Sequence, residues 1–225
     1  MAAQWDKLFV IACDLLDQVN AEHALIDRWS LGGGTAMMLQ IGHRESDDID
    51  IFLGDPQLLS YLDPAKRDFE FDIAPASYST DGAGFLKLAF PGIGEIDFIV
   101  GQPLTDRPWT TAMVAGRTAQ LETISEIITK KIYYRGSRIA PRDIFDIAAT
   151  ATTHQQTVVS ALVHFRQHVE KAVNQITAGD PAFVADMISQ LRIRPAFRSI
   201  AADAVEIASG VLREALTAPT PASGT

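Results

Sequence analysis

The chain has 225 residues, 47% of them hydrophobic, and a formal net charge of -9. This length and hydrophobic content suffice for one domain, or two small ones, with a packed core. The negative net charge excludes a protein that covers duplex nucleic acid with a broad positive surface, so a polyanion would have to bind at a local basic cluster.

The N-terminal segment predicts a helix and no export signal. Apolar residues between positions 5 and 20 recur at helical spacing, and acidic residues interrupt the run. The basic start and the small-residue cleavage site of a signal peptide are missing, and no segment is apolar for long enough to cross a bilayer. The single cysteine, Cys13, excludes an internal disulfide. We therefore expect a cytoplasmic protein.

The next segments predict a strand, a helix and a second strand. Residues 29–31 form a short apolar run, and a glycine turn at 32–35 leads into a helix at 36–41. Residues 48–53 alternate between acidic and apolar, which is the period-two pattern of a strand. A turn at 54–56 then precedes a short helix.

Residues 69–100 are predicted to form β structure. The three apolar runs at 69–74, 84–90 and 95–100 are separated by turn-prone stretches. Residues 101–116 contain two prolines and are predicted to be a connector.

The pattern becomes helical from about residue 117. The predicted helices are 122–135, 141–152, 155–177, 181–192 and 196–216. The sequence therefore predicts an α+β protein with a mixed α/β core at 1–116 and a helical domain at 117–217. The last residues, 218–225, are rich in Pro, Ser, Thr and Gly and are expected to be a disordered tail.

The glycine turn is a candidate phosphate site. Gly33 and Gly34 lie between the predicted strand and helix, where glycine lets the backbone come close to a ligand. Thr35 can cap the helix and offer a hydroxyl group. A simple tight turn also explains the glycines, and the Gly-Lys-Ser/Thr of a phosphate-loop motif does not follow.

Two aspartates on the following strand are candidate metal ligands. Asp48 and Asp50 are two positions apart, so their side chains point to the same face of a sheet. Neighbouring carboxylates repel each other and stay ionised at little cost only beside a cation, and Mg²⁺ prefers carboxylate oxygen. A solvated edge strand with outward-facing acids is the competing interpretation.

Asp97 is the third candidate ligand. It lies between Ile96 and Phe98, as expected for one acid that projects from a buried strand, with Glu95 on the same side. A sheet that places this strand beside 48–53 would bring three carboxylates together. Three carboxylates can bind two metal ions, which stabilise the attacking and the leaving oxygen of an in-line displacement.

These motifs together resemble the nucleotidyltransferase superfamily, and more narrowly the AbiEii/AbiGii toxin family of nucleotidyltransferases (MenT-like). The matching residues are Gly33, Gly34, Thr35, Ala36, Gly42, His43, Arg44, Ser46, Asp48, Ile49, Asp50 and Phe52. The resemblance covers roughly residues 25–150. It implies the nucleotidyltransferase fold, a mixed β-sheet with flanking helices, followed by a C-terminal helical bundle.

The resemblance continues at residues 130–148, which look like the family's later lysine motif and its Arg-Asp-x-x-Asp motif. It implies that Lys131 and Asp146 belong to the active site. Lys130 is the alternative to Lys131, because the register of the motif is ambiguous by one residue. For Asp143, a place in the first turn of a helix is the competing explanation.

The resemblance implies Mg²⁺- or Mn²⁺-dependent transfer of a nucleoside monophosphate from a nucleoside triphosphate to an acceptor hydroxyl. The implied metal ligands are Asp48, Asp50 and Asp97, and Asp97 would also assist in deprotonating the acceptor. The implied nucleotide-binding residues are Gly33, Gly34, Thr35, Arg44, Ser46 and Lys131. The implied catalytic residues are Asp48, Asp50, Asp97, Lys131 and Asp146.

The resemblance also implies the toxin half of a type IV toxin–antitoxin pair, with a cognate antitoxin encoded alongside. Some relatives modify tRNA ends, so RNA is the first candidate acceptor. The cluster Lys130, Lys131, Arg135, Arg138 and Arg142 could form a local patch that faces RNA. Two alternatives remain open. The acceptor could be a small molecule or a protein hydroxyl, or the chain could be a non-catalytic module that binds a nucleotide or a partner.

Overall fold

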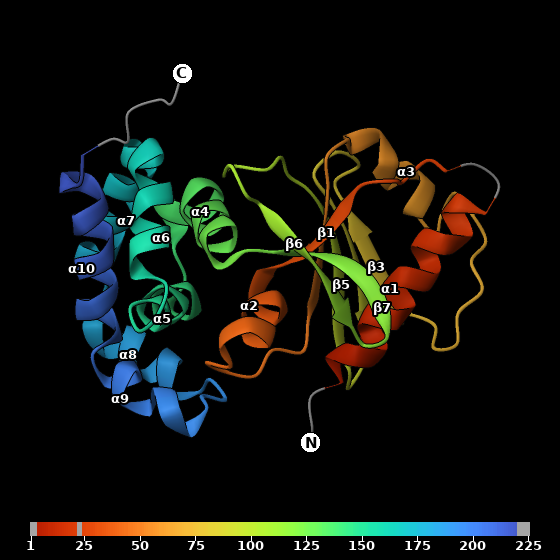
Figure 1. The fold of residues 1–225 in the computed structure, drawn as a ribbon. Helices are drawn as coiled ribbons and strands as arrows, with labels where there is room; N and C mark the ends of the chain where they lie inside the picture. Colours follow the sequence, from red (N-terminus) through yellow and green to blue (C-terminus); the bar gives the residue numbers. More distant parts are fainter. Residues whose placement is uncertain (1–3, 22–23, 220–225) are drawn as a thin grey trace. The chain divides into compact units, whose positions relative to one another are not determined.

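The computed structural model describes residues 4–21 and 24–219 (Figure 1). The chain divides into two compact units, each described here by itself. The sheet unit comprises the described residues up to Leu39, together with Ser46–Pro103 and Trp109–Glu122. The helical unit comprises Gln40–Glu45, Leu104–Pro108 and the described residues from Thr123 onward. The boundary thus lies after Glu122 rather than at residue 116, because residues 117–122 form a strand of the sheet.

The sheet unit is built on one mixed sheet with the strand order β3-β4-β5-β2-β1-β7-β6. The strands are β1 (Trp29–Gly32), β2 (Ile49–Leu53), β3 (Ser77–Thr80), β4 (Phe85–Phe90), β5 (Gly94–Val100), β6 (Trp109–Val114) and β7 (Arg117–Glu122). The central pairs β2–β5 and β1–β7 are parallel, and the other pairs are antiparallel.

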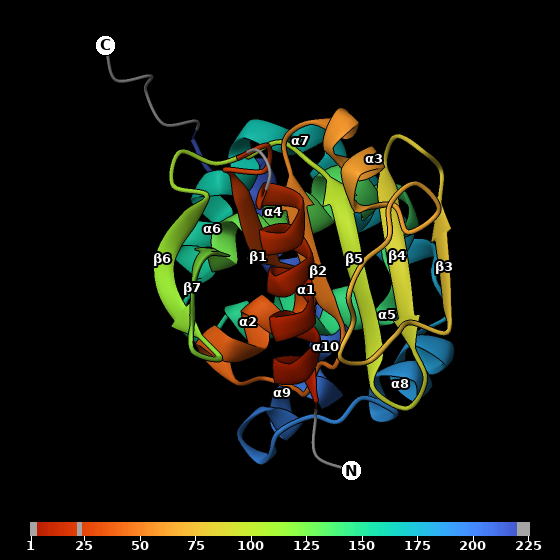
Figure 2. The same cartoon turned by 90° about the vertical axis from the view of Figure 1, so that its right-hand side faces the viewer.

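Alternation of side chains gives the sheet one apolar face, which α1 (Trp5–Asn20) covers (Figure 2). Ile49 and Ile51 on β2 are fully buried, as are Ile96 and Phe98 on β5. The residues between them in sequence point to the opposite face of the sheet. The other helices of this unit are α2 (Gly33–Ile41), whose last two residues belong to the helical unit, the 3₁₀ turn η1 (Pro56–Leu58) and α3 (Leu59–Leu62).

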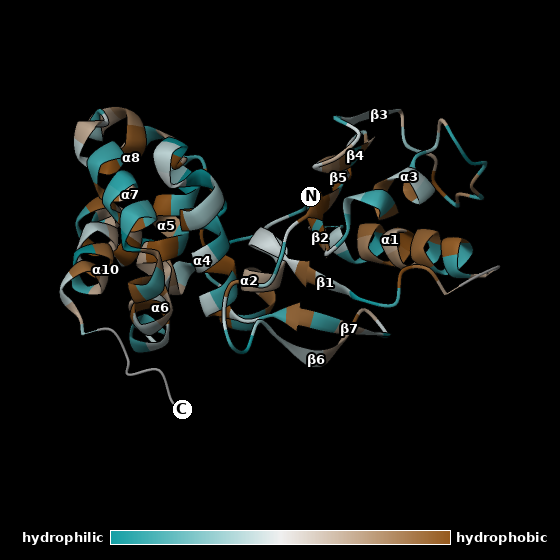
Figure 3. Cartoon of the chain, turned by 90° about the horizontal axis from the view of Figure 1, so that it is seen from above, coloured by the Kyte–Doolittle hydropathy of each residue, from teal (hydrophilic) through white to brown (hydrophobic). Residues whose placement is uncertain are grey.

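The helical unit contains the helices α4 (Ile124–Arg135), α5 (Pro141–Thr150), α6 (Gln155–Leu162), α7 (Arg166–Ala178), α8 (Pro181–Ser189), α9 (Arg198–Ala202) and α10 (Ala204–Thr217). The 3₁₀ turns are η2 (Gly136–Arg138), η3 (Val163–Phe165) and η4 (Pro195–Phe197). Helix α10 packs against α5, α6 and α7. Apolar and polar segments alternate along these helices (Figure 3), as expected when one side of each helix is buried. None of the described helices has both the length and the hydropathy that crossing a bilayer would demand.

Three predictions of secondary structure were wrong. Residues 69–74 form no strand, because the backbone of Glu70 bonds to the side-chain amide of Gln18 on α1 through both its N–H and its C=O (2.9 and 2.8 Å), and Pro75 follows. Strand β3 lies instead at 77–80, partly in a stretch expected to turn. Residues 109–114 form β6, because both prolines of the predicted connector precede that strand.

The remaining predictions of helices agree with the structure, with two interruptions. The predicted helix 155–177 is divided by η3, and the predicted helix 196–216 is formed by η4, α9 and α10 in succession. Of the expected disordered tail, residues 220–225 lie outside the described residues. The α+β fold with a mixed sheet, flanking helices and a C-terminal helical region is confirmed.

Candidate active site

The glycine turn joins β1 directly to α2. Gly33 has a φ of +64°, in the left-handed region that favours glycine. A Cβ atom at Gly33 would lie 1.8 Å from Oδ2 of Asp50, so the Asp50 carboxylate packs directly against the turn. The structure therefore brings the glycine turn and the second aspartate of the Asp-x-Asp strand into contact.

Replacing Gly33 with Ala is expected to lower the free energy of unfolding by more than 1 kcal/mol and to displace Asp50. The new methyl group meets both an unfavourable φ and a carboxylate, so the loss exceeds the usual cost of about 1 kcal/mol for an incompatible Gly-to-Ala change. Urea denaturation measures the effect. Gly210 on α10 is the matched control, because a Cβ atom there meets open space. Gly210→Ala is expected to stabilise the chain, since Ala is the better helix former.

Asp50 and Asp97 face each other across the parallel pair β2–β5. They are direct register partners, and Lys87 on β4 is the partner of Asp97 on its other side. One cross-strand row thus contains Gly32, Asp50, Asp97, Lys87 and Ser79. We call its two aspartates, Asp50 and Asp97, the acidic row. The row lies on the face of the sheet opposite α1. Leu8 of α1 packs beside Gly94 of β5, and positions 94 and 97 of a strand point to opposite faces.

Asp97 lies in an environment that favours a nearby cation. Its side chain is 19% exposed, and among the described residues its Oδ1 atom is buried and accepts no hydrogen bond. Burial raises the pKa of Asp97 from 3.8 to about 6, the negative charge of Asp50 adds to the rise, and Lys87, at 3.4 Å from Oδ2, opposes it. The carboxylate pair therefore carries more negative charge than Lys87 alone offsets.

Asp48 lies immediately before β2 and is held differently from the other two acids. Its carboxylate accepts a hydrogen bond from the backbone N–H of Glu95 at 3.1 Å. Its backbone carbonyl accepts a hydrogen bond from the Thr35 hydroxyl, which is fully buried. Thr35 was expected to offer that hydroxyl to a phosphate, but it fastens α2 to the start of β2. Ser46 donates its backbone N–H to the sulfur of Met38 at 3.3 Å.

The acids fit a hard cation that brings other ligands with it. In the described part of the chain no three Asp, Glu, His or Cys side chains are grouped so as to hold a metal ion by themselves. Mg²⁺ commonly binds through one or two carboxylates, with water and phosphate oxygens completing its six ligands. The facing pair Asp50–Asp97, with its buried unbonded oxygen, matches that pattern.

A second cluster of predicted residues lies within the helical unit. Asp146 on α5 is fully buried and accepts hydrogen bonds from Arg44 through both carboxylate oxygens, at 2.8 and 3.0 Å. The Lys131 ammonium group lies 2.9 Å from Asp146 and also pairs with Asp143. The imidazole Nε2 of His43 lies 2.8 Å from Asp146. The segment 43–45 is in turn held by backbone hydrogen bonds to Arg192 and Arg194.

The charges of this buried network balance. Burial acts to raise the pKa of Asp146, but Lys131 and then Arg44 hold it well below its ordinary value. Burial likewise opposes ionisation of Lys131, yet Asp143 and Asp146 raise its pKa. Two cations therefore meet two carboxylates, an arrangement that fastens Gln40–Glu45 to α4 and α5. The roles of Lys131 and Asp146 in handling the nucleotide remain predictions.

We expect this network to make stability fall steeply in acid. The pKa values of Asp143 and Asp146 are lowered from 3.8, so their contribution is complete above about pH 4 and is lost as pH falls through the lower values of the folded state. Urea titrations between pH 7 and pH 2 would measure the free energy of unfolding. A flat profile below pH 4 would contradict the expectation.

The expected RNA-facing patch is smaller than the sequence predicts. Lys130 lies 3.5 Å from Glu126, and both side chains are buried. Lys131 is committed to the network, and Arg135 lies 3.8 Å from Asp143. Arg138 and Arg142 are exposed. The basic surface in this part of the chain therefore rests mainly on these two arginines, with Arg135 half exposed beside them.

Two residues that contact parts of the candidate site were missed in the sequence. Lys87 is the only charged residue in the apolar run FLKLAF. A single charged residue within an apolar strand is also the pattern that identified Asp97. Glu122 at the end of β7 is fully buried and accepts a hydrogen bond from Ser30 at 2.8 Å. A Cβ atom at Gly32 would lie 2.4 Å from Glu122, so this carboxylate also packs against the turn.

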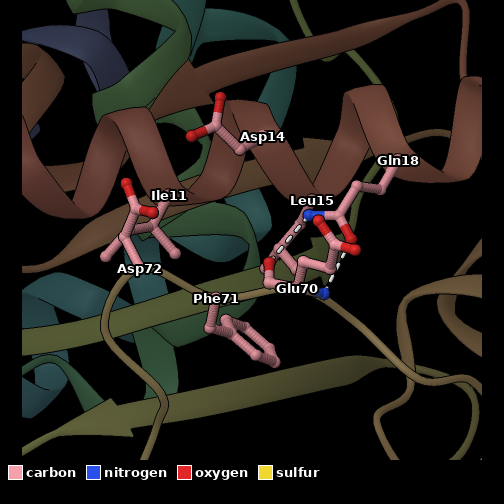
Figure 4. A pocket seen from close by; sticks show the side chains of 7 residues that line it. All are labelled: Ile11, Asp14, Leu15, Gln18, Glu70, Phe71 and Asp72. Carbon is pink, nitrogen blue, oxygen red and sulfur yellow. Dashed lines mark hydrogen bonds between the residues drawn. The ribbon is translucent and has the colours of Figure 1, made fainter.

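A separate pocket lies beside α1, away from the acidic row (Figure 4). It has a volume of about 390 Å³. The residues that line it are Ile11, Asp14, Leu15, Gln18, Glu70, Phe71 and Asp72. Because α1 covers the opposite face of the sheet from Asp50 and Asp97, this pocket is not part of the candidate active site.

Comparisons with known proteins identify the family of the sequence and show structures with a similar fold. The sequence pattern of the family described as nucleotidyl transferase AbiEii toxin, type IV TA system, matches residues 14–218. The nucleotidyltransferase toxin MenT4 (Rv2826c) of Mycobacterium tuberculosis H37Rv has a similar structure, with a TM-score of 0.52 and 16% identity over 96% of this chain and 85% of that one. JHP933 from Helicobacter pylori gives a TM-score of 0.50 and 15% identity over 96% and 93%. Among curated proteins no sequence matches.

Proposed function

Because the chain belongs to the AbiEii family of nucleotidyl transferase toxins of type IV toxin–antitoxin systems, we propose that it transfers a nucleoside monophosphate from a nucleoside triphosphate to an acceptor hydroxyl. The observation that carries the proposal is the facing pair Asp50–Asp97, on the face of the sheet opposite α1, with Asp50 packed against the turn at Gly33. Family membership supports the reaction class, and this pair supports the proposed location of the reaction.

The acidic row would hold Mg²⁺ or Mn²⁺ through Asp50 and Asp97, with Asp48 beside them. The divalent cation would supply charge stabilisation for the triphosphate and for the oxygens that attack and leave. By the family resemblance, Asp97 would also assist in deprotonating the acceptor hydroxyl. The backbone of Gly33 and Gly34, at the start of α2, would donate N–H groups to a phosphate.

The resemblance also assigns residues of the helical unit to the reaction. We keep Lys131, Asp146 and Arg44 in the proposed site on the strength of the sequence motifs, together with Ser46 at the start of the Asp-x-Asp segment. Since Asp143 and Asp146 already neutralise Lys131 and Arg44, their first contribution is to fix the segment Gln40–Glu45, which follows α2. That segment connects the glycine-turn helix to the strand of Asp50.

RNA is the acceptor that we favour, in the cytoplasm, with a cognate antitoxin as the regulatory partner. The exposed guanidinium groups of Arg138 and Arg142 would offer a local docking patch on an otherwise acidic chain. A small molecule or a protein hydroxyl is the second candidate acceptor. A non-catalytic nucleotide-binding role is the third possibility, and the intact set of Asp48, Asp50 and Asp97 argues against it.

The test is incubation with each α-labelled nucleoside triphosphate, Mg²⁺ and total RNA. Labelled RNA that is sensitive to nuclease supports transfer to RNA. Label that resists nuclease assigns the acceptor to a protein or a small molecule. Nucleotide binding without release of pyrophosphate, under all four triphosphates, would overturn the proposed enzymatic function.

A further inference from the structure

Lys87 occupies the position next to the proposed metal ligands in the same cross-strand row. It is the direct register partner of Asp97, on the side opposite to Asp50. Its ammonium group forms a close ion pair with Glu95 and lies 3.4 Å from Asp97 Oδ2. The side chain is 34% exposed, so solvent screens these interactions only in part. A protein cation thus contacts the carboxylate that a divalent cation would need.

The charge of Lys87 persists in this environment. Burial acts to lower its pKa, but the hydrogen bond to Glu95 and the charges of Asp97 and Glu95 outweigh burial and raise the pKa above its ordinary value. The ammonium group therefore remains protonated throughout the neutral range and offsets part of the repulsion between Asp50 and Asp97.

We propose that Lys87 is a built-in counter-ion of the acidic row, which weakens binding of a free divalent cation and favours binding of a cation together with the triphosphate. This inference rests on the proposed function. When a divalent cation binds at Asp97, it meets the repulsion of the nearby ammonium group. The negative charge of a triphosphate offsets that repulsion, so nucleotide and cation bind with positive coupling.

Glu95 gives Lys87 a second carboxylate partner when a divalent cation binds Asp97. Lys87 has two carboxylate partners, Glu95 and Asp97, on the same strand and the same face. Its ammonium group can therefore release Asp97 and keep its pairing with Glu95. The scarcity of ligands is consistent with the proposal, because within the described residues no three acidic, His or Cys side chains are arranged to hold a metal ion without help.

The experiment measures Mn²⁺ binding by the loss of the electron paramagnetic resonance signal of free Mn²⁺. Each protein is titrated alone and with a mixture of the four α,β-methylene nucleoside triphosphates, and the Mn²⁺ that the nucleotides bind without protein is subtracted. For Lys87→Met without nucleotide we expect about fivefold tighter Mn²⁺ binding than in the wild type, because one repelling unit charge is gone. The gain in Mn²⁺ affinity on adding the nucleotides should be smaller in Lys87→Met than in the wild type.

Controls separate this effect from damage to the fold. Lys66→Met removes a lysine of the same unit that is 59% exposed and pairs with Asp63, and it should leave Mn²⁺ binding unchanged. Lys87→Arg keeps the charge and should behave as the wild type. Lys87→Gln provides a polar second variant if Lys87→Met does not fold. A defect in folding would weaken Mn²⁺ binding, so tighter binding cannot arise from it.

The outcomes distinguish this inference from the function on which it rests. A further variant, Asp97→Asn, tests the metal site itself and should bind Mn²⁺ more weakly than the wild type. If it does so, but Lys87→Met and Lys87→Gln both bind Mn²⁺ no more tightly than the wild type, the counter-ion role is overturned and the proposed function stays intact. Equal Mn²⁺ binding by the wild type and Asp97→Asn in the presence of the nucleotides would overturn the metal site itself.

Discussion

Replacement of Asp50 with Asn is expected to abolish transfer to the acceptor while the fold survives. The substitution keeps the shape of the side chain against the glycine turn and removes one of the two facing negative charges. A bound metal ion contributes several kcal/mol of charge stabilisation to such a reaction, so the rate should fall by about a thousandfold or more. Labelled product at saturating triphosphate measures the loss.

The control for Asp50→Asn is Asp68→Asn, which changes an exposed acid of the same unit. This variant has the same change in net charge and should retain full activity. Circular dichroism and urea denaturation should show Asp50→Asn folded, because removing a repelling charge next to Asp97 does not weaken the sheet. Undiminished labelling of the acceptor by Asp50→Asn would exclude the acidic row as the active site.

Replacement of Asp146 with Ala is expected to have the largest effect on stability. The carboxylate is fully buried and pairs with Arg44, Lys131 and His43. Its removal takes the Asp146 carboxylate away from the buried guanidinium of Arg44 and leaves Lys131 with Asp143 alone. Breaking a buried ion pair in this way costs about 3–5 kcal/mol, which is a large part of the stability of an ordinary domain. Urea denaturation at pH 7 measures the change.

Asp186→Ala is the matched control for Asp146→Ala. Asp186 is an exposed acid of the same unit, on α8, and its carboxylate accepts a hydrogen bond from Gln190 at 3.0 Å. Its replacement should change the free energy of unfolding by less than about 1 kcal/mol. A loss below 1 kcal/mol in Asp146→Ala itself would show that the network contributes little to the fold.

Local patterns predicted most elements of the fold, and the failures have identifiable causes. Strands β2, β4 and β5 alternate buried and less buried residues, so period-two patterning located them. The run at 69–74 has a similar composition, but a side-chain amide on α1 binds its backbone. That contact joins residues far apart in sequence, and no local pattern reveals it. Two prolines led to the prediction of a connector where β6 lies. Because both prolines precede the strand, they do not interrupt its hydrogen bonds.

The sequence also predicted that the strands of Asp50 and Asp97 lie side by side. Spacing placed Asp48 and Asp50 in one segment, and the expectation that residues 95–100 lie beside it agrees with the register of β2 and β5. The partners of Lys131 and Arg44 could not be predicted in the same way. Asp146 approaches them from another segment of the helical unit, and only the tertiary structure shows that two cations and two carboxylates balance there.

The parallel pairing at the centre of the sheet bears on how the protein is made. Strand β1 pairs with β7 through Leu31 and Leu121, and Asp50 meets Asp97 only when β5 docks onto β2. Pairings between such distant segments form slowly, because a long loop must close before any contact rewards it. A nascent chain therefore cannot bring Asp50 and Asp97 together before β5, which ends at Val100, has left the exit tunnel of the ribosome.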